Sequence, residues 1–276
     1  MRIDAHHHLW DLSRRPQPWL TGEELAPIDR TFVLDDLRPH LAAHGIDATV
    51  LVQSSGSLDE TRELLAIAEK SDGLVAGVVG WADLTDPELP AVLASLTGPL
   101  VGIRHQVQDE ADPSWLARPQ VRAGLAAVAA ADLAFDLLVT PAQLPAAIDT
   151  VAALPELRFV LDHGAKPPIA SGEWQPWADL VTELAALPNV SCKLSGLITE
   201  ANWQTWRPQD VLPYARHLLT AFTPPRVLFG SDWPVSTLAG CYADVVALTE
   251  QSVAALPPTD QAAVFGTTAA RVYNLR

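Results

Sequence analysis

Short, nearly continuous apolar runs alternate with longer Ala- and Leu-rich stretches along the whole 276-residue chain. Such runs are typical of strands that are covered on both faces, as in parallel sheets. The stretches between them repeat their apolar residues at helical spacing, so the alternation indicates consecutive βα units. Eight strands are predicted, at residues 2–5, 48–53, 75–81, 100–104, 134–139, 158–162, 190–194 and 226–230. Helices are predicted at 60–71, 119–131, 177–187, 213–223 and 243–256, the first opened by the capping-box pattern Ser57-Leu58-Asp59-Glu60.

Eight strands with intervening helices in a chain of this length predict an α/β fold: a single-domain (β/α)8 TIM barrel over residues 1–276. A doubly wound open sheet is the alternative. No glycine-rich phosphate loop follows the first strand, where such a sheet usually carries one. Hydrophobic residues make up 49% of the chain, enough for a sizeable core, and no shift in composition marks a second domain.

Charge and composition exclude several classes of partner. The net charge of −15 argues against nucleic acid and against anionic membrane surfaces. No apolar run approaches the ~18 residues that span a bilayer, and no secretory signal opens the sequence. Cys192 and Cys241 fit no metal or redox spacing. Free thiols in a reducing compartment are therefore expected, and the predicted location is the cytoplasm.

The first predicted strand ends in a run of histidines, Asp4-Ala5-His6-His7-His8. Because successive side chains of a strand point to opposite faces, we expect His6 and His8 to share one face and His7 to lie on the other. Two neutral imidazoles side by side at a strand end can hold a metal ion or polarise a carbonyl group. The alternatives are a tag remnant, for which three histidines are few, and incidental histidines at a surface strand end.

An aspartate follows the last predicted strand, in Gly230-Ser231-Asp232-Trp233-Pro234. Active sites of barrel enzymes lie at the carboxyl ends of the strands, and closure brings the last strand beside the first. Asp232 is therefore expected close to His6 and His8, where a carboxylate base could activate a water molecule. An Asx turn or a helix N-cap is the alternative role for this aspartate.

The sixth predicted strand delivers a further histidine to the same end of the barrel, within Asp162-His163-Gly164-Ala165-Lys166-Pro167. His163 could be another ligand, or could donate a hydrogen bond to a developing oxyanion. Lys166, on the Gly/Pro loop, could hold a substrate oxygen. A structural pair between Asp162 and His163 is the alternative.

Substrate-binding residues are expected at the remaining strand ends. The Arg104 guanidinium can recognise a carboxylate or vicinal oxygens, although arginines also close salt bridges across barrel mouths. His105 follows it directly, and Trp10 and Trp81 offer flat walls for a small ring unless they anchor loops. Lys193 lies within an apolar strand, where a buried lysine needs a carboxylate partner. Its role is left open.

In combination, these motifs resemble the amidohydrolase superfamily. They are most similar to its amidohydrolase 2 branch, which includes sugar-acid lactonases of the fuconolactonase and rhamnonolactonase types and the pyrone-dicarboxylate lactonase. The resemblance extends over essentially the whole chain. It rests on four segments: His6-x-His8, residues 162–167, Lys193-Leu194-Ser195-Gly196 and residues 230–234.

The resemblance implies a (β/α)8 barrel in which Asp232 is the general base, while His6, His8 and His163 bind a metal or polarise the carbonyl. Members with two metals carry a carboxylated lysine at strand four, where this chain has Arg104 and His105. A two-metal site is therefore not expected. One Zn²⁺ or another divalent cation, held by His6, His8 and Asp232, is compatible with the pattern, and so is the metal-independent catalysis that occurs in the branch.

We therefore expect a hydrolase that opens a small sugar-acid lactone, with an activated water attacking the ring ester carbonyl. The expected partner is this small molecule, and the sequence does not distinguish a monomer from a homo-oligomer. One alternative is a metal-dependent decarboxylase of a small unsaturated acid within the same superfamily. The other, of a different class, is a non-catalytic barrel that binds a sugar acid.

Overall fold

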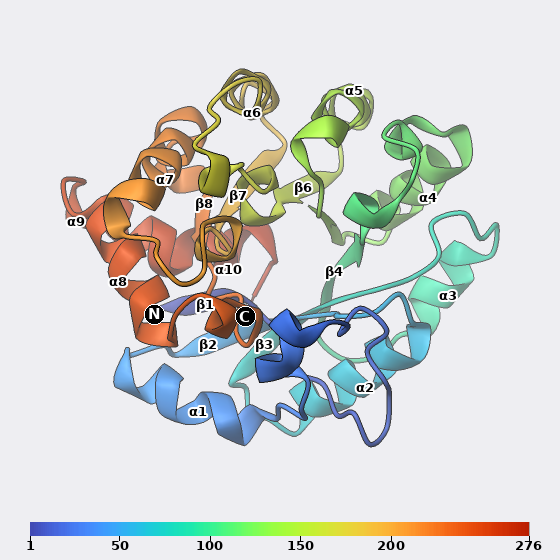
Figure 1. Ribbon diagram of the computed structural model, residues 1–276. Helices are drawn as coiled ribbons and strands as arrows, with labels where there is room; N and C mark the ends of the chain where they lie inside the picture. Colours follow the sequence, from blue (N-terminus) through green and yellow to red (C-terminus); the bar gives the residue numbers. More distant parts are fainter. Residues whose placement is uncertain (276) are drawn as a thin grey trace.

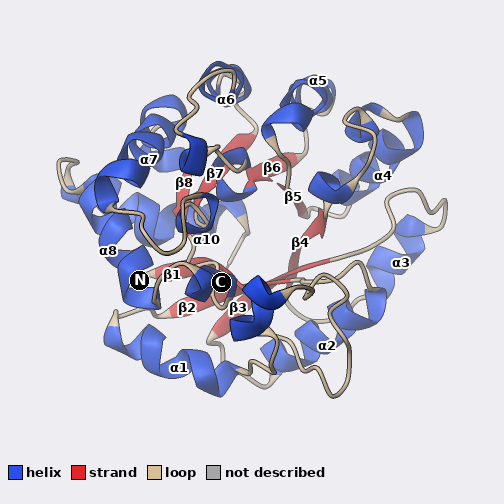
Figure 2. Ribbon diagram, viewed as in Figure 1, coloured by secondary structure: helices blue, strands red, loops and turns tan. Residues whose placement is uncertain are grey.

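Eight parallel strands form a central barrel that a ring of helices surrounds (Figure 1, Figure 2). The computed structural model describes residues 1–275, so only the last residue of the predicted 1–276 barrel lies outside the described part. Neighbouring strands pair in chain order from the first to the eighth. The strands are β1 Ile3–His7, β2 Ala48–Val52, β3 Val75–Gly80, β4 Leu100–His105, β5 Ala134–Leu137, β6 Arg158–Leu161, β7 Val190–Leu194 and β8 Val227–Phe229.

The barrel closes where the end of β1 meets the segment after β8. His7 forms a parallel bridge with Trp233. The backbone N–H of Asp232 donates to the carbonyl of His6 at 2.8 Å, and that of His8 donates to the carbonyl of Trp233 at 2.7 Å. The predicted eight strands and the (β/α)8 architecture are confirmed, with strand ends that differ from the predicted ones by at most two residues.

All five predicted helices are present, but the chain forms more helices than the pattern indicated. Those that were not predicted include α1, α3 and α5. Pro39 interrupts the helical period inside α1, whereas Pro90 and Pro145 lie in the first turns of α3 and α5, where a helix tolerates proline. The helices are α1 Leu34–Ala43, α2 Leu58–Glu69, α3 Leu89–Ser95, α4 Pro119–Ala130, α5 Leu144–Ala153, α6 Trp177–Ala185, α7 Pro208–Phe222, α8 Tyr242–Val253, α9 Pro258–Ala262 and α10 Thr268–Val272.

Two helix starts differ from the predicted ones by more than one residue. α7 begins five residues early, at Pro208, because the Asp210 carboxylate accepts a hydrogen bond from the backbone N–H of Arg207 at 2.8 Å. α2 begins at Leu58, and the Ser57 hydroxyl accepts from the N–H of Glu60 as a capping box requires. The Glu60 carboxylate turns away, however, and accepts from the N–H groups of residues 54 and 55.

The apolar core has two parts. The larger part fills the space between the strands and the outer helices, and it contains the Cys192 thiol. The smaller part lies inside the barrel, where α10 closes the amino-terminal end; it comprises Ile3, Ala5, Ala48, Val50, Val52, Val79, Ala134, Val160, Leu228, Ala269, Val272 and Tyr273. Within residues 1–275, the helices are all too short or too polar to cross a bilayer.

A buried group of charges lies at the centre of the barrel. The Lys193 ammonium lies 2.9 Å from Oδ1 of Asp162 and donates to Oδ2 of Asp136. The Tyr273 hydroxyl, from the C-terminal end of the chain, donates to Oδ1 of Asp136 at 2.8 Å. Lys193 and both carboxylates are fully excluded from solvent. The prediction that Lys193 needs a carboxylate partner is confirmed, and it has two.

Replacing Lys193 with methionine should leave two carboxylates buried without their shared cation. We expect the Lys193→Met variant to lose about 3–5 kcal/mol of unfolding free energy, measured by urea denaturation. The double variant Lys193→Met/Asp136→Asn removes one of the stranded charges and should regain part of that loss. If the unfolding free energy of Lys193→Met were within about 0.5 kcal/mol of the wild-type value, the proposed role of the ion pair would be contradicted.

Candidate active site

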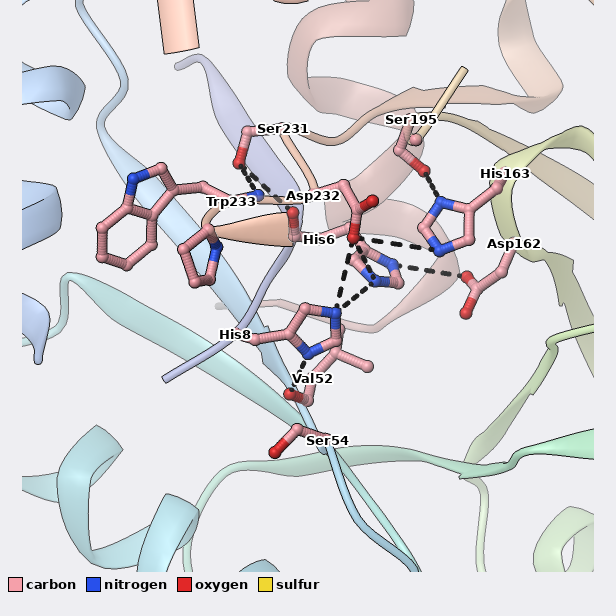
Figure 3. Close-up of polar contacts among 12 residues, drawn as sticks. His6, His8, Val52, Ser54, Asp162, His163, Ser195, Ser231, Asp232 and Trp233 are labelled. Carbon is pink, nitrogen blue, oxygen red and sulfur yellow. Dashed lines mark hydrogen bonds and ion pairs between the residues drawn. The ribbon is translucent and has the colours of Figure 1, made fainter. Parts of the chain in front are cut away.

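Four of the predicted site residues converge at the carboxyl end of the barrel (Figure 3). His6 and His8 come from the end of β1, His163 from the turn after β6, and Asp232 from the segment after β8. Oδ1 of Asp232 lies 3.6 Å from Nε2 of His6, 3.5 Å from Nε2 of His8 and 3.9 Å from Nε2 of His163. All four side chains are buried. His7 points elsewhere, with Nε2 2.9 Å from the Thr49 hydroxyl.

The partners of His6 and His8 define which ring nitrogens carry protons. Nδ1 of His8 lies 2.8 Å from the carbonyl oxygen of Val52, so it must be the donor, and its Nε2 carries a lone pair. Two groups that can only donate contact His6: the Lys193 ammonium lies 3.1 Å from Nδ1 and the Arg104 guanidinium 3.4 Å from Nε2. The shorter contact, together with the lone pair on Nε2 of His8, favours the His6 proton on Nε2. That Nε2 lies 3.1 Å from Nε2 of His8. The two imidazoles thus form a directed chain of donors from Lys193 to the β2 backbone.

His163 is held by the strand that follows it. Its Nδ1 lies 2.9 Å from the hydroxyl of Ser195, at the end of β7. The neighbouring Asp162 carboxylate contacts His6, Lys193 and Arg104 instead. The alternative of a structural pair between Asp162 and His163 is therefore wrong, and the His163 ring is left facing Asp232.

Burial decides the charge of the imidazoles. It lowers the pKa of His163 to about 4 and lowers the pKa of His6 well below its ordinary value. Burial alone would raise the pKa of Asp232, but His163, His8 and the Lys166 ammonium together hold it below its ordinary value. Near neutral pH the site therefore contains an ionised Asp232 carboxylate and the neutral imidazoles of His6 and His163. The carboxylate faces the imidazoles, which does not fit an Asx turn or a helix N-cap.

His8, His163 and Asp232 open onto a cavity of ≈ 260 Å³, whereas His6 does not reach its lining. Several of its lining residues were not predicted, because they lie on the loops after β1, β4, β7 and β8, whose paths the sequence pattern does not define. The one available signal was the polar run Gln106-Val107-Gln108-Asp109 directly after β4. The cavity is lined by His8, Trp19, Ser54, Arg104, Gln106, Gln108, Asp109, Leu138, His163, Lys166, Thr199, Asp232 and Val235.

Arg104 and Lys166 line this cavity, as predicted for substrate-binding residues, but both carry protein partners. The Arg104 guanidinium lies 3.0 Å from Oδ2 of Asp162 and donates to the carbonyl of Gln53 at 2.5 Å. Lys166 Nζ lies 2.8 Å from Oε1 of Glu200, a residue that the sequence did not point to. A role for either residue in substrate binding stays a prediction.

The other three predicted binding residues lie outside the cavity lining. His105 stacks on Trp115 and accepts a hydrogen bond from Nε1 of Trp81 at 3.2 Å. Trp10 borders a separate hollow of ≈ 480 Å³ between the β1–α1 loop, α1 and α2, away from the convergent imidazoles. Its Nε1 donates to the carbonyl of Arg30 at 2.6 Å, which is the loop-anchoring role considered for the tryptophans.

A metal ion would find suitable donor atoms in this site. Nε2 of His6, Nε2 of His8 and a carboxylate oxygen of Asp232 lie within 4.8 Å of one another. Imidazole nitrogens and a carboxylate oxygen are ligand types that zinc prefers. The hydrogen bond from His8 to the Val52 carbonyl is of the kind that orients a ligating histidine. His6 would have to release its Nε2 proton, because metal ligands bind deprotonated.

Comparison with known proteins places this site in a family. Residues 3–275 match the family described as Amidohydrolase. A Burkholderia ambifaria protein named L-fucono-1,5-lactonase is 44% identical over 283 residues, covering 99% of this chain and 96% of that protein. A Burkholderia multivorans protein of the same name is 38% identical, covering 100% of this chain and 96% of that protein. A crystal structure of a Burkholderia multivorans amidohydrolase with bound zinc has a TM-score of 0.94 at 38% identity, over 100% of both chains.

Gly196 makes room for the His163 ring, which yields a test of the site's packing. Its φ is +62°, and a Cβ there would lie 2.4 Å from Nδ1 of His163. Gly172 is the matched control, because its φ is +72° and a Cβ there would meet nothing within 4 Å. We expect Gly196→Ala to lose about 1–3 kcal/mol more unfolding free energy than Gly172→Ala in urea denaturation. Equal losses of unfolding free energy in the two variants would show that the His163 ring does not restrict the side chain at position 196.

Proposed function

The chain belongs to the amidohydrolase family, and from that premise we propose that it is a lactonase that opens a small sugar-acid lactone by hydrolysis. The observation that carries this proposal is the ionised Asp232 carboxylate beside the imidazoles of His6, His8 and His163. The two full-length relatives named L-fucono-1,5-lactonase support the choice of a sugar lactone. The cavity of ≈ 260 Å³ suits a ligand of one small ring.

In the first step, Asp232 takes a proton from a water molecule as the water oxygen bonds to the lactone carbonyl carbon. The carboxylate is suited to this because its pKa lies below the ordinary value, so it is ionised when the substrate enters. It is also buried, so a proton it accepts stays in the site.

The resulting tetrahedral oxyanion needs hydrogen-bond donors. His163 lines the cavity and can supply such a donor from Nε2 when the Ser195 hydroxyl donates to its Nδ1. His6 lies behind the lining, and its Nε2 contact orients the His8 ring instead. Removal of one such donor typically costs about 2.7–4 kcal/mol in the transition state.

In the second step, the intermediate collapses and the bond between the carbonyl carbon and the ring oxygen breaks. The leaving alkoxide takes the proton that Asp232 holds, and the carboxylate is regenerated. The product is an open-chain hydroxy acid, which releases a proton to the solvent. One water is consumed for each lactone opened.

A divalent cation held by His6, His8 and Asp232 would supply Lewis-acid polarisation of the carbonyl when bound. The donor set suits such an ion, and the zinc-bound crystal structure of the relative supports one here. The side chains of this chain would still carry out the proton transfers, at Asp232, and hold the His163 ring, through Ser195.

The two alternatives have weaker support. Decarboxylation does not need a base placed to activate water, and the two full-length relatives at 44% and 38% identity are named lactonases. A non-catalytic binding barrel gives no reason to bury a carboxylate among three imidazoles. The proposal extends to a small-molecule lactone as the partner and to the cytoplasm as the location.

Replacing the base should abolish turnover without unfolding the barrel. Against a panel of aldonolactones in a pH-indicator assay, we expect wild-type protein to release acid and Asp232→Asn to lose about 10²–10⁴ in rate. Asp149→Asn, which neutralises an exposed carboxylate on α5, is the control and should keep wild-type rates. The proposal would be contradicted if the wild type released no acid from any lactone of the panel, or if Asp232→Asn kept near-normal rates.

The metal site can be tested by binding alone. We expect the wild-type chain to take up about one Zn²⁺ in equilibrium dialysis, and His8→Asn to bind zinc at least about tenfold more weakly. His44→Asn, which changes a histidine far from the cavity, should bind as the wild type does. Equal zinc affinity in all three proteins would place the ion elsewhere.

A further inference from the structure

We propose that Glu200 determines the charge of the substrate: by pairing with Lys166 it leaves the cavity without a free ammonium group, so the site accepts neutral lactones and rejects those that carry a carboxylate. This inference rests on the proposed lactonase function and adds a specificity-determining residue to it.

The ion pair joins two loops at the mouth of the barrel. Lys166 follows β6, with φ at 50°, and Glu200 ends the short turn Ile198–Glu200 after β7. The Lys166 Nζ lies 2.8 Å from Oε1 of Glu200, and both side chains are about three-quarters buried. Lys166 and Thr199 line the cavity while Glu200 lies behind them. The carboxylate is thus placed to neutralise the ammonium without touching the ligand.

The second cation of the cavity is also neutralised. Arg104 is 3% exposed, and its guanidinium is held by Asp162 and by the Gln53 carbonyl. Two further carboxylates line the cavity: Asp232, which faces the imidazoles of His8 and His163, and Asp109, which is exposed and for which the described residues provide no ion pair within 4.0 Å. With both cations paired, these two carboxylates give the side chains of the lining a net negative charge.

A carboxylate on the substrate would enter this cavity against that charge. It would lose its hydration shell and gain no unpaired ammonium or guanidinium in return, which is unfavourable for a buried ion. Like-charge contacts of this kind are a common way to exclude the wrong ligand.

The uncharged polar side chains of the lining can form hydrogen bonds with the hydroxyl groups of a substrate. Ser54, Gln106, Gln108 and Thr199 all border the cavity. Oε1 of Gln108 is buried and has no hydrogen-bond partner among the described residues, so it is an acceptor that a substrate hydroxyl could satisfy. The lining thus provides neutral partners for a polyol, while its ammonium and its guanidinium are each already paired with a carboxylate.

The test compares two substrates that differ only at the terminal carbon: galactono-γ-lactone carries a CH₂OH group there, and galactaro-γ-lactone a carboxylate. We expect wild-type kcat/KM to favour the neutral lactone by about 100-fold or more. Glu200→Gln is close to isosteric and unpairs Lys166, so it should narrow that ratio by at least about tenfold, chiefly by lowering KM for the acid.

Two variants separate the ion pair from the general charge of the cavity. Asp109→Asn also removes one negative charge from the cavity but leaves Lys166 paired, so it should narrow the ratio by less than about threefold. The double variant Glu200→Gln/Lys166→Gln removes the freed ammonium and should restore the discrimination. As a measurement that needs no variant, the wild-type ratio should fall at about 1 M salt, where partly exposed charges are screened.

The outcomes distinguish this inference from the function on which it rests. If the wild type opens neither lactone, nor any other of the aldonolactone panel, the proposed function fails and the role of Glu200 fails with it. If the neutral lactone is opened but Glu200→Gln leaves the ratio unchanged, only the role of Glu200 is overturned. Equal narrowing by Asp109→Asn and Glu200→Gln would also overturn it.

Discussion

The contact between the Lys193 ammonium and the carboxylates of Asp136 and Asp162 holds the rest of this structure in place. It joins β7 to β5 and to the end of β6 inside a barrel whose other interior side chains are mostly small and apolar. A charge in such surroundings is stable only when it is paired, so each of the three groups fixes the position of the other two. Tyr273 adds a hydroxyl from the C-terminal end of the chain, which ties the closed end of the barrel to the same group.

The same ammonium contacts His6, one of the histidines of the candidate active site. Its contact with Nδ1 favours the ring's proton on Nε2, and the chain of hydrogen bonds ends at the backbone of β2. Burial keeps His6 and His163 neutral, while Asp232 stays ionised close to them. Charges are therefore separated within the barrel. The Lys193 ammonium is paired with Asp136 and Asp162 in the interior, and the Asp232 carboxylate lies at the carboxyl end beside the neutral imidazoles of His6 and His163.

The sequence predicted the barrel and the convergence of His6, His8, His163 and Asp232 because both follow from local patterns. Apolar runs mark the strands, and the geometry of a closed barrel brings their carboxyl ends together. The sequence could not show that the Arg104 guanidinium faces Asp162, since that depends on which of several neighbouring carboxylates is nearest in space. Nor could it show Glu200 beside Lys166, because the two residues lie on different loops whose relative positions are set by tertiary packing.

This difference between strands and loops explains how one barrel could keep its chemistry and change its substrate. The strands are hydrogen-bonded to their neighbours, and the backbones of His8 and Asp232 are bonded across the junction of β1 with the segment after β8, so these side chains cannot shift without disturbing the barrel. Loop residues such as Glu200 face no such constraint, and an exchange of one carboxylate there alters the charge of the cavity while the imidazoles stay in place. Because Lys166 also contributes to the low pKa of Asp232, the loop charges and the base are not independent. A substitution that frees Lys166 from Glu200 would therefore change two things at once: the binding of an acidic substrate and the pKa of Asp232, the proposed base.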